Sequence, residues 1–172
     1  MKRLASLALL LLLACPQAGL AGDLTLSFAD PAWNGKSVPS GQICKKFGGN
    51  GSAPSISVAG IPAEADALVL EFSDRSYSPM NHGGHGKVGY RITPGAGTVV
   101  VPSFAGETFT LPEGFFLISK HTGWSEPGAY LPPCSGGKSN KYVVTVKAVK
   151  LESEDGKSFK TLAEEVLSLG YY

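Results

Sequence analysis

The sequence predicts a mainly β protein, folded as a sandwich or a barrel. About seven short apolar or alternating segments are separated by turn signals, which is the pattern of such folds. Glycine and proline are plentiful, with 22 and 12 residues, and they favour long, shaped loops. A hydrophobic share of 43% is enough for a packed core and excludes a disordered chain.

The predicted strands follow one another along the chain. In segment 24–28 apolar and polar residues alternate, which is the period of a half-buried strand. Segment 67–72 is almost entirely apolar, so we expect a central strand covered on both faces. Only segment 162–169 has a helical pattern, and we expect one short C-terminal helix there. The other predicted strands are 55–58, 87–92, 98–101, 115–118 and 142–151.

Residues 1–21 have the pattern of a cleavable signal peptide. Two basic residues precede an apolar run, and small residues lead to the expected cut after Ala21. The run is too short for a transmembrane anchor, which needs roughly 20 apolar residues. Residues 22–172 would then form a single domain in the periplasm or outside the cell. The alternative is a lipoprotein anchored at Cys15, although the preceding residues fit that motif poorly.

The charge balance argues against two classes of partner. The chain has 15 basic and 14 acidic residues, and two of the basic residues lie in the predicted signal. The remaining 13 basic and 14 acidic residues give a net charge of −1. A nucleic-acid-binding protein usually has a basic face, and simple adhesion to an anionic membrane also needs excess positive charge. We therefore expect no nucleic-acid partner.

Two cysteines remain after signal removal, Cys44 and Cys134. In an oxidising compartment an isolated pair is a candidate disulfide, and we expect these two to be joined. The alternative is two separate buried thiols, because sequence alone does not give their geometry.

Two long loops hold all three histidines of the chain. Segment 73–86 contains Asp74 and His85, and segment 120–141 combines a histidine with aromatic residues and prolines. Loops of this length in a compact domain are usually functional. Their imidazoles, hydroxyls and aromatic side chains suit a pocket for a small polar or anionic ligand. The plainer alternative is that Asp74 caps a turn and His85 bonds to the loop backbone.

The same loops also admit a metal site. His82 and His85 lie three residues apart, Met80 is close in sequence, and His121 lies in the second loop. Imidazole and thioether ligands suit copper or zinc. We keep an extracytoplasmic copper or zinc protein as the alternative function.

Catalysis is not expected. The sequence has neither the Gly-x-Ser-x-Gly elbow of many hydrolases nor a Gly-x-x-x-x-Gly-Lys phosphate loop. We expect no cofactor.

The order of four partial motifs resembles the phosphatidylethanolamine-binding protein family, and within it the bacterial Raf kinase inhibitor-like branch. Together the motifs span roughly residues 24–150. They are the segment from Cys44 through Pro54 to Ser57, a Gly-Ile-Pro turn and strand ending in Ser-Asp over 60–74, the strand 85–92 that begins with His85, and the Gly-to-Cys segment 128–134 followed by 140–144.

The resemblance implies a β-sandwich with a small cavity that accepts phosphate-like groups or phospholipid headgroups. It also implies action by binding or inhibiting other proteins, as a monomer or a weak homodimer. Carried over residue by residue, the match places four residues in the pocket and two in its wall. The pocket residues are Asp74, His85, Asn140 and Tyr142, and the wall residues are Pro133 and Cys134.

This sequence departs from the family pattern at several of those positions. Ser76 stands in place of a second Asp, Lys87 in place of a Trp, and Asn140 in place of a second pocket His. Asn140 donates hydrogen bonds but cannot become cationic. We therefore expect an exported, non-catalytic binding or inhibitory protein with an altered pocket.

Overall fold

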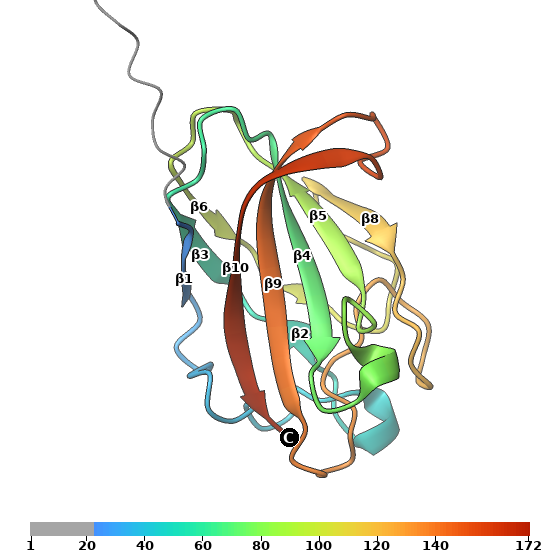
Figure 1. The fold of residues 1–172 in the computed structure, drawn as a ribbon. Coiled ribbons are helices and arrows are strands. Elements are labelled where there is room, and N and C mark those ends of the chain that lie inside the picture. Colours follow the sequence, from blue (N-terminus) through green and yellow to red (C-terminus); the bar gives the residue numbers. More distant parts are fainter. Residues whose placement is uncertain (1–22) are drawn as a thin grey trace, which may run out of the picture.

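A computed structural model describes residues 23–172, so the predicted signal peptide and Cys15 lie outside the described residues. These residues form ten strands and two short 3-10 helices (Figure 1). The strands are β1 (Thr25–Phe28), β2 (Ser52–Ala53), β3 (Ile56–Ala59), β4 (Ala67–Asp74), β5 (Lys87–Arg91), β6 (Thr98–Val101), β7 (Phe104–Ala105), β8 (Phe115–Ser119), β9 (Lys141–Leu151) and β10 (Phe159–Tyr171). The 3-10 helices are η1 (Lys45–Phe47) and η2 (Ser78–Met80).

Two antiparallel sheets form the sandwich. The larger sheet has the order β10-β9-β4-β5-β8, and the smaller has the order β1-β3-β6. A short third sheet pairs β2 with β7. The mainly β prediction is therefore confirmed, and all seven predicted strands are present.

The main core lies between the sheets. On β4, Leu68, Leu70 and Phe72 point into it and are fully or almost fully buried. The Phe72 ring lies 4.4 Å from Tyr130 and 6.1 Å from Phe104, between ring centroids. Alternate residues of β4 therefore supply one face of the core.

The opposite face of β4 is also buried, as the continuous apolar pattern predicted. Ala67 and Val69 form a second cluster with Val149. In Figure 1 the far end of the β9–β10 hairpin curls over this side of the sheet, and Phe159 packs against the cluster. β4 is thus the central strand of the larger sheet.

The predicted helix over 162–169 is wrong, because these residues lie in β10. Strand β10 pairs with β9 along almost its whole length. Its register shifts between Thr161 and Ala163 and again between Ser168 and Gly170. Each bulge moves the apolar side chains out of the two-residue period. The broken alternation imitates the spacing of a short helix.

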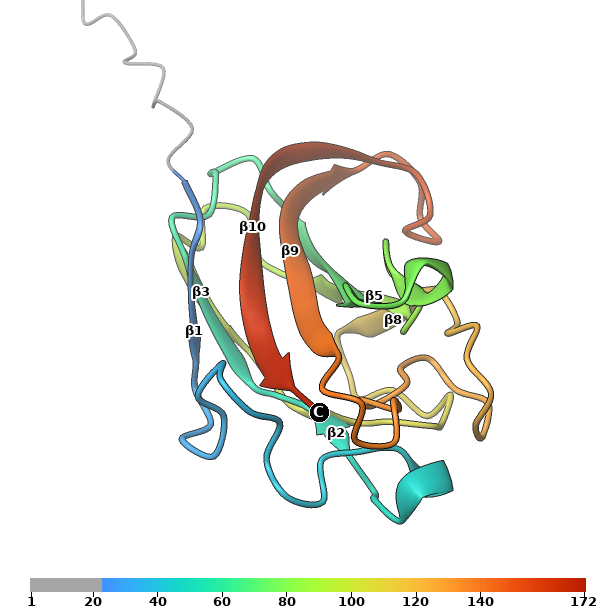
Figure 2. The same ribbon diagram turned by 60° about the horizontal axis from the view of Figure 1, so that its bottom comes forward.

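The long loops gather at one end of the sandwich. Figure 2 brings this end forward and shows the η1 turn beside the segments that lead into β9. β4 runs two residues beyond its predicted end, so Asp74 closes the strand at this end of the sheet. Within residues 23–172 no helix has the length and apolar character needed to cross a membrane.

Replacing Phe72 with Ala tests the packing of the main core. Because Phe72 is 1% exposed between two aromatic rings, the truncation should lower the free energy of unfolding by about 3–5 kcal/mol. Urea denaturation followed by circular dichroism measures this loss. The control is Val166→Ala on β10, where the side chain is 44% exposed. Equal effects of the two substitutions would contradict the described core.

Candidate functional site

A cavity of about 780 Å³ opens at the loop end of the sandwich. Its volume lies in the usual range for sites that hold drug-sized molecules. Buried polar side chains line its inner part, and exposed aromatic and lysine side chains line its mouth. The lining residues are Lys46, Phe47, Asp74, Ser76, Tyr77, Pro79, Met80, His85, Thr122, Gly123, Trp124, Leu131, Cys134, Ser135, Gly136, Lys138, Asn140 and Tyr142.

Sheet register places Asp74 at the floor of this cavity. Asp74 ends β4 and pairs with Tyr142 near the start of β9. Its Oδ1 accepts hydrogen bonds from the backbone N–H groups of Ser76 and Tyr77, at 2.8 and 3.1 Å. Its Oδ2 accepts one from Asn140 Nδ2 at 2.6 Å. Asp74 therefore caps a turn, as the plainer alternative expected, and also lines the cavity.

His85 lies beside this carboxylate and is held by backbone. Its Nδ1 is 2.8 Å from the carbonyl oxygen of Leu131. A carbonyl only accepts, so Nδ1 carries the ring proton and Nε2 keeps its lone pair. Burial lowers the pKa of His85 to about 4, although the Leu131 carbonyl and Asp74 both act to raise it. The imidazole is therefore neutral at pH 7.

Tyr142 connects the cavity floor to the disulfide. Its ring lies edge-on to His85, with centroids 5.3 Å apart. Its hydroxyl oxygen accepts a hydrogen bond from the Cys134 backbone N–H at 3.1 Å. Burial raises the pKa of this phenol to about 12, so it stays protonated in any ordinary buffer.

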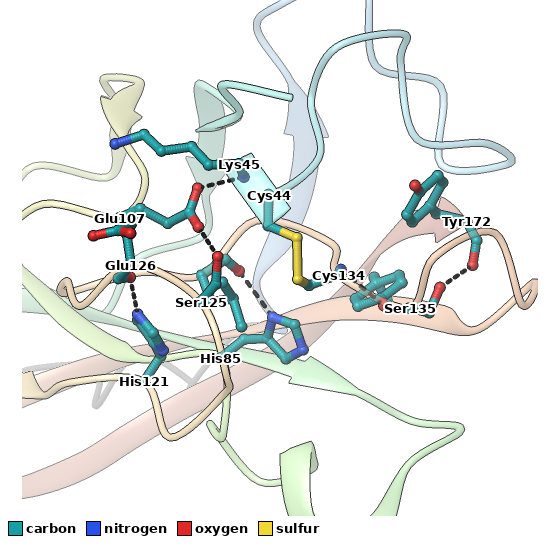
Figure 3. The surroundings of a disulfide bond; sticks show 12 residues. Cys44, Lys45, His85, Glu107, His121, Ser125, Glu126, Cys134, Ser135 and Tyr172 are labelled. Atoms are coloured by element: carbon teal, nitrogen blue, oxygen red, sulfur yellow. Dashed lines mark hydrogen bonds between the residues drawn. A yellow bond between two sulfur atoms is a disulfide. The ribbon is translucent and has the colours of Figure 1, made fainter. Parts of the chain in front are cut away.

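The Cys44–Cys134 disulfide, predicted from the sequence, is present. Figure 3 shows it between the η1 turn and the wall of the cavity, close to His85. The Cys44 backbone N–H also donates to the carbonyl oxygen of Pro133 at 3.1 Å. The covalent bond and this hydrogen bond fix η1 against the wall.

The structure gathers most of the predicted pocket residues around one cavity. Asp74, His85, Cys134, Asn140 and Tyr142 all line it. Pro133 does not. It is buried behind the wall, and its carbonyl oxygen is used by Cys44.

The four residues of the metal alternative are divided between different places. Met80 and His85 line the cavity, whereas His82 is exposed outside it. His121 is buried, and its Nε2 donates to the Glu126 carbonyl oxygen at 3.0 Å. Within residues 23–172 no three His, Cys, Asp or Glu side chains lie close enough together to hold a metal ion.

Sequence reasoning missed a buried acid that braces two loops of the mouth. Glu107 is 5% exposed, and its Oε2 accepts from the Lys45 backbone N–H at 2.8 Å. Its Oε1 accepts from the Ser125 hydroxyl, which lies next to Trp124. Figure 3 shows these two contacts, one at each oxygen of the carboxylate. Glu107 thus connects the η1 turn to the loop that carries Trp124.

The mouth residues Lys46, Phe47, Trp124 and Lys138 were also missed as a group. They come from two loops that are far apart in the sequence, around 46–47 and within 120–141, and no motif connects them. The only available signal was the aromatic and basic content of those loops.

Comparison with solved structures identifies the fold. The chain aligns with CT736 from Chlamydia trachomatis, a phosphatidylethanolamine-binding protein homologue, over 87% of this chain and 97% of that one, with 20% identity and a TM-score of 0.56. It aligns equally with YbcL from E. coli, a member of the mammalian phosphatidylethanolamine-binding protein family, over 88% and 98%, with 19% identity and a TM-score of 0.54. The chain has a phosphatidylethanolamine-binding-protein-like fold.

Comparison of the sequence alone finds no relative. No protein-family model matches it, and no curated protein matches it significantly. The phosphatidylethanolamine-binding-protein-like fold agrees with the resemblance drawn from the four partial motifs. At 19–20% identity the likeness concerns the fold, so the chemistry of the cavity must be argued from this chain's own residues.

Asn140→Asp tests the contact at the cavity floor. The new carboxyl would lie where Nδ2 now donates to Asp74, and two carboxylates this close do not both ionise in the folded protein. One pKa of the pair then rises above its unfolded value, so stability is lost as the pH rises through that raised pKa. We expect a clear loss of unfolding free energy at pH 7.5 that shrinks towards pH 4.5.

The control for this experiment is Asn50→Asp, at an exposed loop position. Urea denaturation at the two pH values measures both variants. A loss for Asn140→Asp that does not change with pH would contradict the described contact.

Glu107→Ala tests the brace between the mouth loops. Removing the carboxylate leaves the Lys45 N–H and the Ser125 hydroxyl without their acceptor, at a cost of about 1–3 kcal/mol in unfolding free energy. Glu107→Gln should cost less, because its amide oxygen can accept from Lys45 and its NH₂ group can donate to the Ser125 oxygen. Equal losses for the two variants in urea denaturation would show that the acceptor role is unimportant.

Proposed function

We propose that this chain is a non-catalytic binding protein whose cavity holds the anionic group of a small molecule. The observation that carries the proposal is the distribution of charge along the lining. Lys46 and Lys138 line the cavity, and neither makes an ion pair with another described residue. The opposing charge is Asp74, whose two oxygens already accept three hydrogen bonds. The cations are therefore the groups left for a ligand.

His85 supports the same proposal. Its Nε2 has a free lone pair when the ring is neutral, and an anion close to it favours the protonated ring. His85 can therefore accept a hydrogen bond from a protonated ligand oxygen, or take up a proton when a fully ionised anion binds. Both responses suit a phosphate-like group.

Several features support binding rather than catalysis. The Tyr142 phenol is held protonated, and His85 is a weak base at pH 7 because burial lowers its pKa. Both structural neighbours, CT736 and YbcL, are also named as relatives of phosphatidylethanolamine-binding proteins. Export to the periplasm or the cell exterior, and inhibition of a partner protein, stay predictions from the sequence. No observation favours the copper or zinc alternative.

Inorganic sulfate is the first probe, with affinity measured by isothermal titration calorimetry. The double variant Lys46→Ala/Lys138→Ala should bind sulfate at least about tenfold more weakly, because it loses both free cations of the lining. The matched control is Lys36→Ala/Lys160→Ala, which removes the same charge from exposed positions outside the cavity. Equal affinities of the two double variants, or no sulfate binding to the wild type, would contradict the proposal.

Sulfate affinity should also depend on pH through His85. The empty protein has a His85 pKa of about 4, and the bound anion raises it. Binding then takes up a proton between the two pKa values, so affinity rises as the pH falls from 7.5 towards 4.5. Sulfate keeps its charge over this pH range, so its own ionisation does not contribute to the pH dependence of the affinity. His85→Gln should give a flat profile, and an unchanged slope in that variant would exclude His85 as the group responsible.

A further inference from the structure

An inorganic anion would fill only a small part of the 780 Å³ cavity, and the remaining space has its own chemistry. Five aromatic side chains are exposed among the described residues: Phe47, Tyr77, Phe109, Trp124 and Tyr171. Three of the five, Phe47, Tyr77 and Trp124, line this one cavity. Exposed aromatic side chains that gather at one place mark a binding surface rather than chance exposure.

From this mouth we infer that the ligand is an aryl anion, in which the anionic group is attached to a flat aromatic ring. The inference rests on the proposed function, since it extends the ligand beyond its anionic group. The exposed aromatic side chains of the mouth would cover the aryl ring of the ligand, while Lys46 and Lys138 bind its anionic group. The occupant is a small molecule, because a volume of about 780 Å³ is that of a small-molecule site.

Trp124 is the most informative residue of the mouth. It is 78% exposed, so it contributes little to the core, yet its loop is fixed on both sides. On one side Ser125 is held by Glu107. On the other side Gly123 lies directly against Leu131 and Met80, where an added Cβ would come within 2.4 Å of the Leu131 side chain. The backbone at Trp124 is therefore held in place, so little loop entropy is lost when its exposed indole stacks on a ligand.

The chemistry around the mouth favours an aromatic ring over an alkyl chain. The Lys46 ammonium lies 5.8 Å from the Phe47 ring centroid, so a cation and an aromatic ring of the protein are adjacent. A ligand that carries an anionic group directly on an aromatic ring can contact both at once. Inside the mouth, Met80 is 8% exposed and presents a thioether, which packs well against aromatic rings. An aromatic ligand ring that packs against an aromatic side chain gains binding free energy beyond the burial of its surface, whereas an alkyl chain gains only from burial.

Three organic sulfates distinguish the contribution of an aromatic ring to the affinity from the contribution of the charge. Methyl sulfate carries the anion alone, 1-naphthyl sulfate adds a flat ring system, and octyl sulfate adds an alkyl chain. Calorimetric titration of the wild type should give about tenfold tighter binding for naphthyl sulfate than for methyl sulfate, since stacking on the rings of the mouth adds to the affinity. Octyl sulfate should bind more weakly than naphthyl sulfate.

Trp124→Ala should remove most of the naphthyl preference and leave methyl sulfate affinity within about twofold of the wild type. The matched control is Phe109→Ala, an exposed aromatic residue outside the cavity, which should change neither affinity. Stronger binding of octyl sulfate, or a naphthyl preference that survives Trp124→Ala, would overturn the inference.

The two proposals fail in different ways. If methyl sulfate binds through Lys46 and Lys138 but naphthyl sulfate binds no better, the aryl inference is wrong and the anion-binding function stands. If none of the three sulfates binds, the proposed function fails and the inference fails with it.

Discussion

The covalent bond between Cys44 and Cys134 is the constraint on which the candidate site depends. It closes a loop with a sequence separation of 90 residues, and on the chain-entropy account such a bond stabilises a fold by about 4–5 kcal/mol. It joins the η1 turn to Cys134. The Cys134 backbone N–H in turn donates a hydrogen bond to the hydroxyl oxygen of Tyr142 on β9. The turn that carries Lys46 and Phe47 is thereby attached to β9 of the larger sheet. Without this bond, only hydrogen bonds and side-chain packing would hold this side of the cavity mouth.

The floor and the mouth of the cavity have different chemistry. At the floor, Asp74 and His85 are buried, and backbone groups together with Asn140 satisfy most of their polar atoms. The Asp74 carboxylate is therefore largely satisfied within the protein. The mouth has free lysines and exposed rings on loops that Glu107 and the disulfide brace. The floor therefore shapes the cavity and adds the titratable His85, whereas the mouth supplies the cations and the exposed rings that attract and select a ligand.

Local patterns in the sequence predicted most of the sheet and several cavity residues. Alternation or continuous apolar character revealed the seven strands, and the order of partial motifs pointed to Asp74, His85, Asn140 and Tyr142. Strand β10 was missed because two bulges disturb its two-residue period. Glu107 was missed for another reason. Its partners, Lys45 and Ser125, are brought to it only by the folded loops, so no spacing along the chain could reveal the contact.

The most direct test of this account is to locate the bound anion by nuclear magnetic resonance. Isotope-labelled protein would be titrated with 1-naphthyl sulfate while the backbone amide signals and the His85 ring signals are followed. We predict that the largest shifts fall on residues of the mouth and floor, such as Lys46, Trp124, Ser135 and His85, with little change at the opposite end of the sandwich. Shifts centred elsewhere, for example around Asp66 and Arg91, would contradict the assignment of this cavity as the binding site.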